Sequence, residues 1–211
     1  MAGTVTWLAD GPSVVEDLEV FGSVSPIRAV TEAAAAGEGW TEQRRDEIQQ
    51  LFDSMAPGWT GGHSSAAQEL PLTDGLARGG VGGDRIVELG AGTGLGTSEI
   101  VDRLGPVVGV DLSLAMLQHQ RTAEPMVQAD ASILPFGDSS IDALVLVNML
   151  LFPAEVDRVL REDGSLLWVN TIGSETPIYL SPEAVVDALL GAWQATAARA
   201  GSGFWAAVRR A

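Results

Sequence analysis

The chain has 211 residues, 46% hydrophobic and 19% charged, and this composition predicts a folded globular domain. Its net charge of −16 argues against nucleic acid as a partner, because binding a phosphate backbone requires clustered basic side chains. Cys and Lys are absent from the sequence, which excludes disulfides, thiol nucleophiles and the lysine of a phosphate-binding loop.

The sequence also predicts neither a metal site nor a membrane segment. His63 and His119 are the only His residues, and they lack the paired spacing of a metal site. The first twenty residues show no basic segment followed by an apolar one, so no signal peptide is expected. The longest apolar run, ALVLVNMLLF, is too short to cross a bilayer. We therefore expect a cytoplasmic protein without a membrane partner, and a homodimer is left open.

Residues 1–82 are less regular than the rest of the chain. Residues 1–47 indicate only short mixed structure. Residues 42–56 predict a helix, because apolar residues recur there at helical spacing and Pro57-Gly58 follows. The stretch GWTGGHSS indicates a loop, and RGGVGG at 78–83 indicates a hinge before the first strand of a second unit, residues 83–211.

From residue 83 onward, strand patterns alternate with helical patterns. The strand patterns are RIVEL, PVVGV, MVQA, IDALVLV and SLLWVN, and the helical patterns are GTSEIVDRL, LAMLQHQR (capped by Ser113) and PAEVDRVLRE. Gly201-Ser202-Gly203 then separates two further strand patterns, as in an antiparallel hairpin. The pattern predicts an α/β fold of the Rossmann-like three-layer type, with a mostly parallel seven-stranded sheet and a C-terminal antiparallel hairpin.

A glycine-rich stretch, RIVELGAGTGLG, follows the first of these strands and places Gly at 90, 92, 94 and 96. Such a loop lets a ligand approach the backbone closely, although an ordinary turn between a strand and a helix is the alternative. A nicotinamide fingerprint needs a third glycine five residues after the first, where this chain has Leu95. The loop therefore disfavours a nicotinamide cofactor.

Two carboxylates are expected at the same sheet edge. Asp111 ends the second strand, where it can accept hydrogen bonds from both hydroxyls of a ribose, or simply start the next helix. Asp130 follows the third strand, and its carboxylate can accept from an exocyclic amino group such as that of adenine. Together with the glycine loop, these carboxylates favour a nucleoside ligand.

The motifs together resemble those of the class I S-adenosylmethionine-dependent methyltransferases. VELGAGTGLG, VGVDLSLAML, QADASILPF and IDALVLVNML are similar to four of the family's motifs, in order, over about 84–171. The resemblance implies the cofactor S-adenosyl-L-methionine. It also implies contacts to the cofactor's methionine part by Glu88 and Asn148, to its carboxypropyl chain and ribose by Gly90, Ala91, Gly92 and Asp111, and to its adenine by Leu112, Met116, Asp130 and Ala131.

The helix before Trp59 also resembles the lid segment of small-molecule methyltransferases of ubiquinone and menaquinone biosynthesis. The family often has Tyr in this lid, whereas this chain has Trp59. The resemblance makes 1–82 a lid and substrate-contacting segment, with the acceptor pocket expected to be lined by Trp7, Trp40, Phe52 and Trp59. His63 is the candidate catalytic base, with a solvated loop histidine as the alternative.

Two functions remain open at this point. One is methyl transfer to a small-molecule acceptor. The other is a protein of the same fold that binds the cofactor without methylating, as a regulatory subunit or with the cofactor in a structural role. The binding motifs would be the same in both cases.

Overall fold

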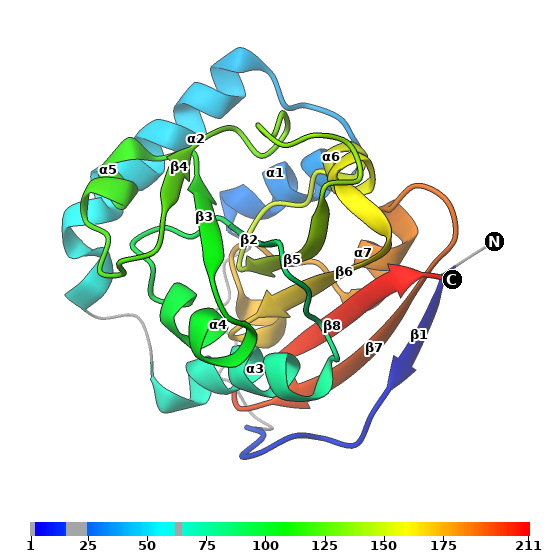
Figure 1. Ribbon diagram of the computed structural model, residues 1–211. Coiled ribbons are helices and arrows are strands. Elements are labelled where there is room, and N and C mark those ends of the chain that lie inside the picture. The colour runs from blue at the N-terminus through cyan, green and yellow to red at the C-terminus, as the bar shows by residue number, and fades with distance from the viewer. Residues whose placement is uncertain (1–2, 16–24, 62–64) are drawn as a thin grey trace.

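The computed structural model describes residues 3–15, 25–61 and 65–211. Within them, eight strands form one sheet between layers of helices (Figure 1). The strands are β1 (Thr4–Trp7), β2 (Ile86–Leu89), β3 (Val107–Asp111), β4 (Met126–Gln128), β5 (Ile141–Val147), β6 (Leu160–Asn170), β7 (Trp193–Ala200) and β8 (Gly203–Arg210). The helices are α1 (Pro26–Ala35), α2 (Glu42–Met55), α3 (Ala66–Arg78), α4 (Thr97–Leu104), α5 (Leu114–Gln118), α6 (Pro153–Val159) and α7 (Pro182–Ala188), with 3-10 turns η1 (Ala56–Gly61) and η2 (Gly173–Glu175).

The strand order is β1-β7-β8-β6-β5-β2-β3-β4. The five strands β2 to β6 run parallel to one another. Strand β8 is antiparallel to both β6 and β7. The chain moves outward from β2 to β3 and β4, and then returns to β5 on the other side of β2. The order therefore reverses between β2 and β5, which is where open α/β sheets bind their ligands. The α/β fold, the mostly parallel sheet and the terminal hairpin are confirmed.

The number of strands differs from the prediction of seven. The eighth is β1, which pairs in parallel with β7, so that Thr4 lies beside Gln194. Four residues are too few for a recognisable strand pattern, and the extended state of β1 depends on the free edge that β7 offers. The helical pattern at PAEVDRVLRE is also shorter than predicted, because Leu160 already pairs with Ile141 as the start of β6.

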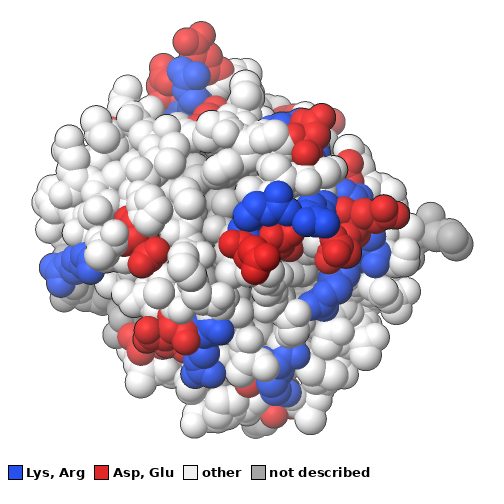
Figure 2. All heavy atoms as spheres, viewed as in Figure 1, with Lys and Arg blue, Asp and Glu red and all other residues white. Residues whose placement is uncertain are grey.

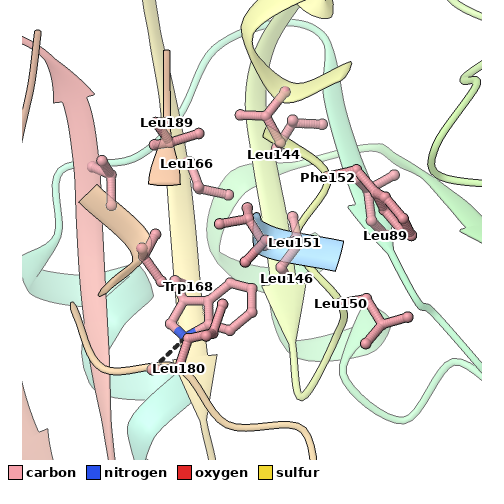
Figure 3. Close-up of a cluster of buried hydrophobic side chains, with 14 of the residues drawn as sticks. Leu89, Leu144, Leu146, Leu150, Leu151, Phe152, Leu166, Trp168, Leu180 and Leu189 are labelled. Atoms are coloured by element: carbon pink, nitrogen blue, oxygen red, sulfur yellow. Dashed lines mark hydrogen bonds between the residues drawn. The ribbon is translucent and has the colours of Figure 1, made fainter. Parts of the chain in front are cut away.

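Two hydrophobic clusters lie on the two faces of the sheet. The larger one packs β2, β5, β6 and β8 under α1, α6 and α7, and Figure 3 shows its centre around Trp168, whose indole N–H donates to the carbonyl of Leu180 at 3.2 Å. The other cluster packs the opposite face under α3 and α4. The helix α3 approaches β8 closely at Gly75, where a Cβ atom would lie 3.0 Å from Trp205. Three layers result, with α2 crossing beside α5 (Figure 1).

Candidate functional site

The glycine loop follows β2 at the carboxyl edge of the sheet. Its start is held by the amides of Gly90 and Ala91, which both donate to the carbonyl of Val110 at the end of β3. Gly90, Gly92 and Gly94 have φ values of 75°, 55° and 81°, in the left-handed region that favours glycine. A Cβ at Gly90 would lie 2.6 Å from the sulfur of Met149. The chain therefore needs glycine here both for its φ angles and for the close packing of two strand-end loops.

Gly92 is less tightly enclosed than its neighbour Gly90. The nearest atom to a Cβ at Gly92 would be the indole nitrogen of Trp59, at 3.9 Å. Thr93, the next residue, is only 1% exposed, and its hydroxyl has no hydrogen-bond partner among the described residues. A buried hydroxyl without a partner is uncommon in folded proteins and marks this loop as a place where a polar group of a ligand can bind.

Asp111 closes β3 and holds the loop from the side. Its carboxylate accepts from the amide of Gly92 at 2.8 Å and from the amide of Ser113 at 2.7 Å. Burial raises the pKa of Asp111 above its ordinary value, the two amide hydrogen bonds lower it, and the charge of Asp53 raises it further. The carboxylate is thus fixed in orientation by two backbone donors, one of which belongs to the glycine loop.

Asp130 lies beyond β4 and contacts Trp40, which lies just before α2. Both carboxylate oxygens lie 3.2 Å from the indole nitrogen of Trp40, which donates to them, and one oxygen also accepts from the amide of Ser132 at 2.8 Å. The ring of Trp40 packs edge to face against Phe152, with 4.9 Å between the centroids. Ala131, the next residue after Asp130, is buried.

Glu88 lies in β2, directly under the glycine loop. Its side chain is 2% exposed and accepts from the hydroxyl of Thr97 at 2.5 Å. Burial raises the pKa of Glu88 to about 7, against the opposing effect of the Thr97 hydrogen bond, and the charge of Asp111 contributes to the rise. Glu88 is therefore a buried acid whose pKa lies near neutrality, two residues before the first glycine of the loop.

The remaining predicted residues lie at the ends of β3 and β5. Met116 is 2% exposed in α5, and Leu112 is partly buried just before that helix. Asn148 follows β5 with a φ of 49°, and its side chain exchanges two hydrogen bonds with Thr171 after β6, at 2.8 and 2.9 Å. The fold thus brings the predicted cofactor residues to one edge of the sheet, while their contacts to a cofactor stay predictions.

Residues from α2 and η1 cover this edge. Asp53 accepts from the hydroxyl of Ser113 and from the amide of Ala115 at the start of α5. Phe52 and Trp59 pack edge to face, 6.0 Å between centroids. Trp7 does not join them, because it lies on the edge strand β1, where its indole donates to Glu183. His63 lies outside the described residues, and its role stays a prediction.

Sequence reasoning missed Asp53, Thr93 and Thr171 as members of this edge. Thr93 lies within the glycine motif, which was the available signal, but Asp53 and Thr171 carry no local pattern.

The helices of the described ranges include none that is both long and apolar enough to cross a membrane. Figure 2 shows acidic and basic side chains next to each other on the face in view, and ion pairs of the described residues include Arg85–Asp142 at 3.1 Å and Arg158–Asp138 at 2.8 Å.

Comparisons with known proteins find a similar domain and similar sequences over part of the chain. Residues 87–167 match the family described as "Methyltransferase domain". The demethylmenaquinone methyltransferase of Renibacterium salmoninarum is 31% identical over 131 residues, which are 57% of this chain and 54% of that protein. That of Corynebacterium urealyticum is 37% identical over 92 residues, 40% of each. The chain thus spans about half the length of the first of these curated relatives and less of the second.

Solved structures show the same fold at low identity. A structure described as the DhpI–SAH complex superposes with a TM-score of 0.62 at 20% identity, covering 80% of this chain and 97% of that one. The [4+2]-cyclase SpnF superposes with a TM-score of 0.55 at 20% identity, covering 72% and 75%. Residues 87–167 thus match a methyltransferase domain, and the chain shares the fold of these solved structures.

Proposed function

We propose that this chain transfers a methyl group from S-adenosyl-L-methionine to a small-molecule acceptor. The observation that carries the proposal is that the matched domain, residues 87–167, folds so that the glycine loop, Asp111 and Asp130 lie at the carboxyl ends of the neighbouring parallel strands β2, β3 and β4, beside the point where the strand order reverses. The match to demethylmenaquinone methyltransferases supports a quinol-like ring as the first acceptor to test.

The residues of this edge fit the proposed cofactor. Gly90 and Gly92 have positive φ angles and carry no side chains that would cover the backbone of the loop. The buried hydroxyl of Thr93 has no hydrogen-bond partner within the described ranges. Asp111 and Asp130 would accept from the ribose hydroxyls and the adenine amino group, with Leu112, Met116 and Ala131 beside the base. Glu88 would face the ammonium of the methionine part, and Asn148 would lie near it.

The cofactor supplies a methyl group on a sulfonium, and the protein's task is to hold an acceptor in line with it. Alignment at about 3–3.5 Å accounts for much of the acceleration in such reactions. The cover formed by α2 and Trp59 would exclude water from the reacting atoms. His63 remains the proposed base for an acceptor hydroxyl, with an effect of roughly 10²–10⁴-fold on the rate. A cytoplasmic location also remains part of this proposal.

Calorimetry with S-adenosylmethionine and S-adenosylhomocysteine tests the cofactor half of the proposal. We expect Asp111→Asn to weaken binding of both ligands roughly tenfold or more, because it removes the charge that accepts the ribose hydroxyls. Asp163→Asn is the matched control, since that side chain is 83% exposed in an ion pair with Arg161. If the wild type bound neither ligand, the proposal would be wrong.

Methyl transfer itself requires a second assay. Labelled cofactor is incubated with a panel of quinols, phenols and amines, with demethylmenaquinol first, and transfer of the label is followed. The same fold in a [4+2]-cyclase shows that the architecture alone does not decide the reaction. Tight cofactor binding without transfer to any class of acceptor would favour the non-methylating alternative.

A further inference from the structure

Three residues that precede α3 reach three different loops of the proposed cofactor site. The indole of Trp59 lies against Gly92, the carboxylate of Asp53 binds Ser113 beside Asp111, and the indole N–H of Trp40 binds Asp130. The first two contacts involve neither the carboxylate of Asp111 nor that of Asp130. The third differs, because Trp40 takes up the carboxylate that is proposed to recognise adenine.

The Trp40 indole resembles the adenine edge in its chemistry. Both are planar fused rings of a five- and a six-membered ring, and both can donate an N–H to a carboxylate. The indole nitrogen is 3.2 Å from each oxygen of Asp130, while the amide of Ser132 binds one of them. The ring system of Trp40 also packs edge to face with Phe152. Asp130 therefore already carries an aromatic N–H donor from the chain itself.

The backbone around Trp40 is built as a short turn between two helices. Gly37 and Gly39 have φ values of 73° and 68°, and Thr41 caps α2 by accepting from the amide of Arg44. A Cβ at Gly37 would have no neighbour within 4 Å. Trp40 is thus held at its place by side-chain contacts to Asp130 and Phe152, and the turn that carries it has open space on one side.

We propose that Trp40 is a resident occupant of the adenine-recognition position, and that S-adenosyl ligands displace its indole from Asp130 when they bind. This inference rests on the proposed function, because it takes Asp130 as the adenine acceptor. If the indole must be displaced, the apparent dissociation constant of the wild type equals the intrinsic constant divided by the fraction of molecules in which Asp130 is free. The wild type therefore binds more weakly than a protein in which Asp130 is always free. Trp40 would then link the position of the α1–α2 turn to cofactor exchange.

The test measures the dissociation constant of S-adenosylhomocysteine for the full chain and its variants by calorimetry. Trp40→Phe keeps an aromatic ring against Phe152 but removes the N–H, so it should bind about three- to tenfold more tightly than the wild type. Trp7→Phe is the matched control, because its indole also donates to a carboxylate, that of Glu183 at 3.0 Å, but from the edge strand opposite β4. Its affinity should equal that of the wild type.

A double-mutant comparison separates competition for Asp130 from a general loosening of the cover. In an Asp130→Ala background, which should itself weaken binding, Trp40→Phe should have no further effect, since no carboxylate remains to compete for. If the indole instead stays in place and lines the site, Trp40→Phe should bind S-adenosylhomocysteine more weakly than the wild type or equally well. That result would overturn the inference. The proposed function would survive that result as long as the wild type binds; absence of wild-type binding would overturn both.

The wild type provides a second readout that does not depend on the variant folding. In nitrogen-15 spectra of the indole groups, the assigned signal of Trp40 should move when S-adenosylhomocysteine is added, because its N–H loses a carboxylate partner. The signal of Trp7 should stay where it is. A Trp40 signal unchanged at saturating ligand would overturn the displacement.

Discussion

Replacing Glu88 by Gln should remove a pH dependence from the stability of the protein. Glu88 is 2% exposed, and burial raises its pKa from 4.5 to about 7. Between these two values the folded state holds a proton that the unfolded chain has released, so the free energy of unfolding falls as the pH rises. Each pKa unit corresponds to about 1.4 kcal/mol, so the loss in the wild type reaches about 3 kcal/mol above pH 7.

Gln keeps an oxygen for the Thr97 hydroxyl but has no proton to lose in this range. The stability of Glu88→Gln relative to the wild type should therefore rise by about 2–3 kcal/mol between pH 5 and pH 8. Urea unfolding followed by circular dichroism at pH 5, 6, 7 and 8 measures this difference, provided the slopes agree between the two proteins.

The matched control is Glu99→Gln on α4, whose carboxylate is partly exposed in an ion pair with Arg103 at 3.1 Å. Its stability relative to the wild type should vary little over the same pH range, because exposed pairs contribute little. A constant difference between Glu88→Gln and the wild type from pH 5 to pH 8 would refute the reasoning, since it would mean that Glu88 ionises in the folded state as easily as in the unfolded chain.

Two more predictions concern the same loop. An ammonium beside Glu88 would favour its ionised form, so binding of S-adenosylhomocysteine at pH 6 should release up to one proton. Calorimetry in buffers of different ionisation enthalpy measures this release. Equal release by Glu88→Gln would contradict the contact between Glu88 and the ammonium. Gly90→Ala should lower the free energy of unfolding by about 2–4 kcal/mol, because the residue has a positive φ and the new Cβ would lie 2.6 Å from the sulfur of Met149. Gly37→Ala has a similar φ but open space around the new Cβ, so it should lower the free energy of unfolding by only about 1–2 kcal/mol. Equal losses in urea unfolding would show that the contact with Met149 relaxes without cost.

The predicted elements agree with the structure where the local pattern and the tertiary environment favour the same conformation. The strands β2 to β5 are short, and helical patterns separate β2 from β3, β3 from β4 and β5 from β6. Ser113 caps α5 by accepting from the amide of Met116, as predicted. The hairpin of β7 and β8 is similarly marked by its glycines, with Gly201 at a φ of 53°. These signals lie within a few residues of each other, so the sequence displays them.

The elements that were not predicted depend on distant partners. The helix α3 contains Pro71 and Gly75, both of which normally interrupt helices, and it forms because its buried face packs onto β8 and β6. The contact of Trp40 with Asp130 joins residues 90 positions apart in the chain. Sequence patterns reveal that Trp40 is aromatic and that Asp130 ends a strand, but the meeting of the two side chains is a property of the fold alone.

The position of β8 inside the sheet has a consequence for how the protein folds during synthesis. Every strand is made before β8, yet β8 lies between β6 and β7, and β7 in turn holds β1 through pairs such as Thr4 with Gln194. A nascent chain that ends before β8 leaves β6 with an open edge and leaves β7 and β1 without a connection to the rest of the sheet. Such edges pair readily with other chains, and contacts this far apart in sequence form slowly. Assembly of three of the eight strands must therefore wait until β8 has left the ribosome.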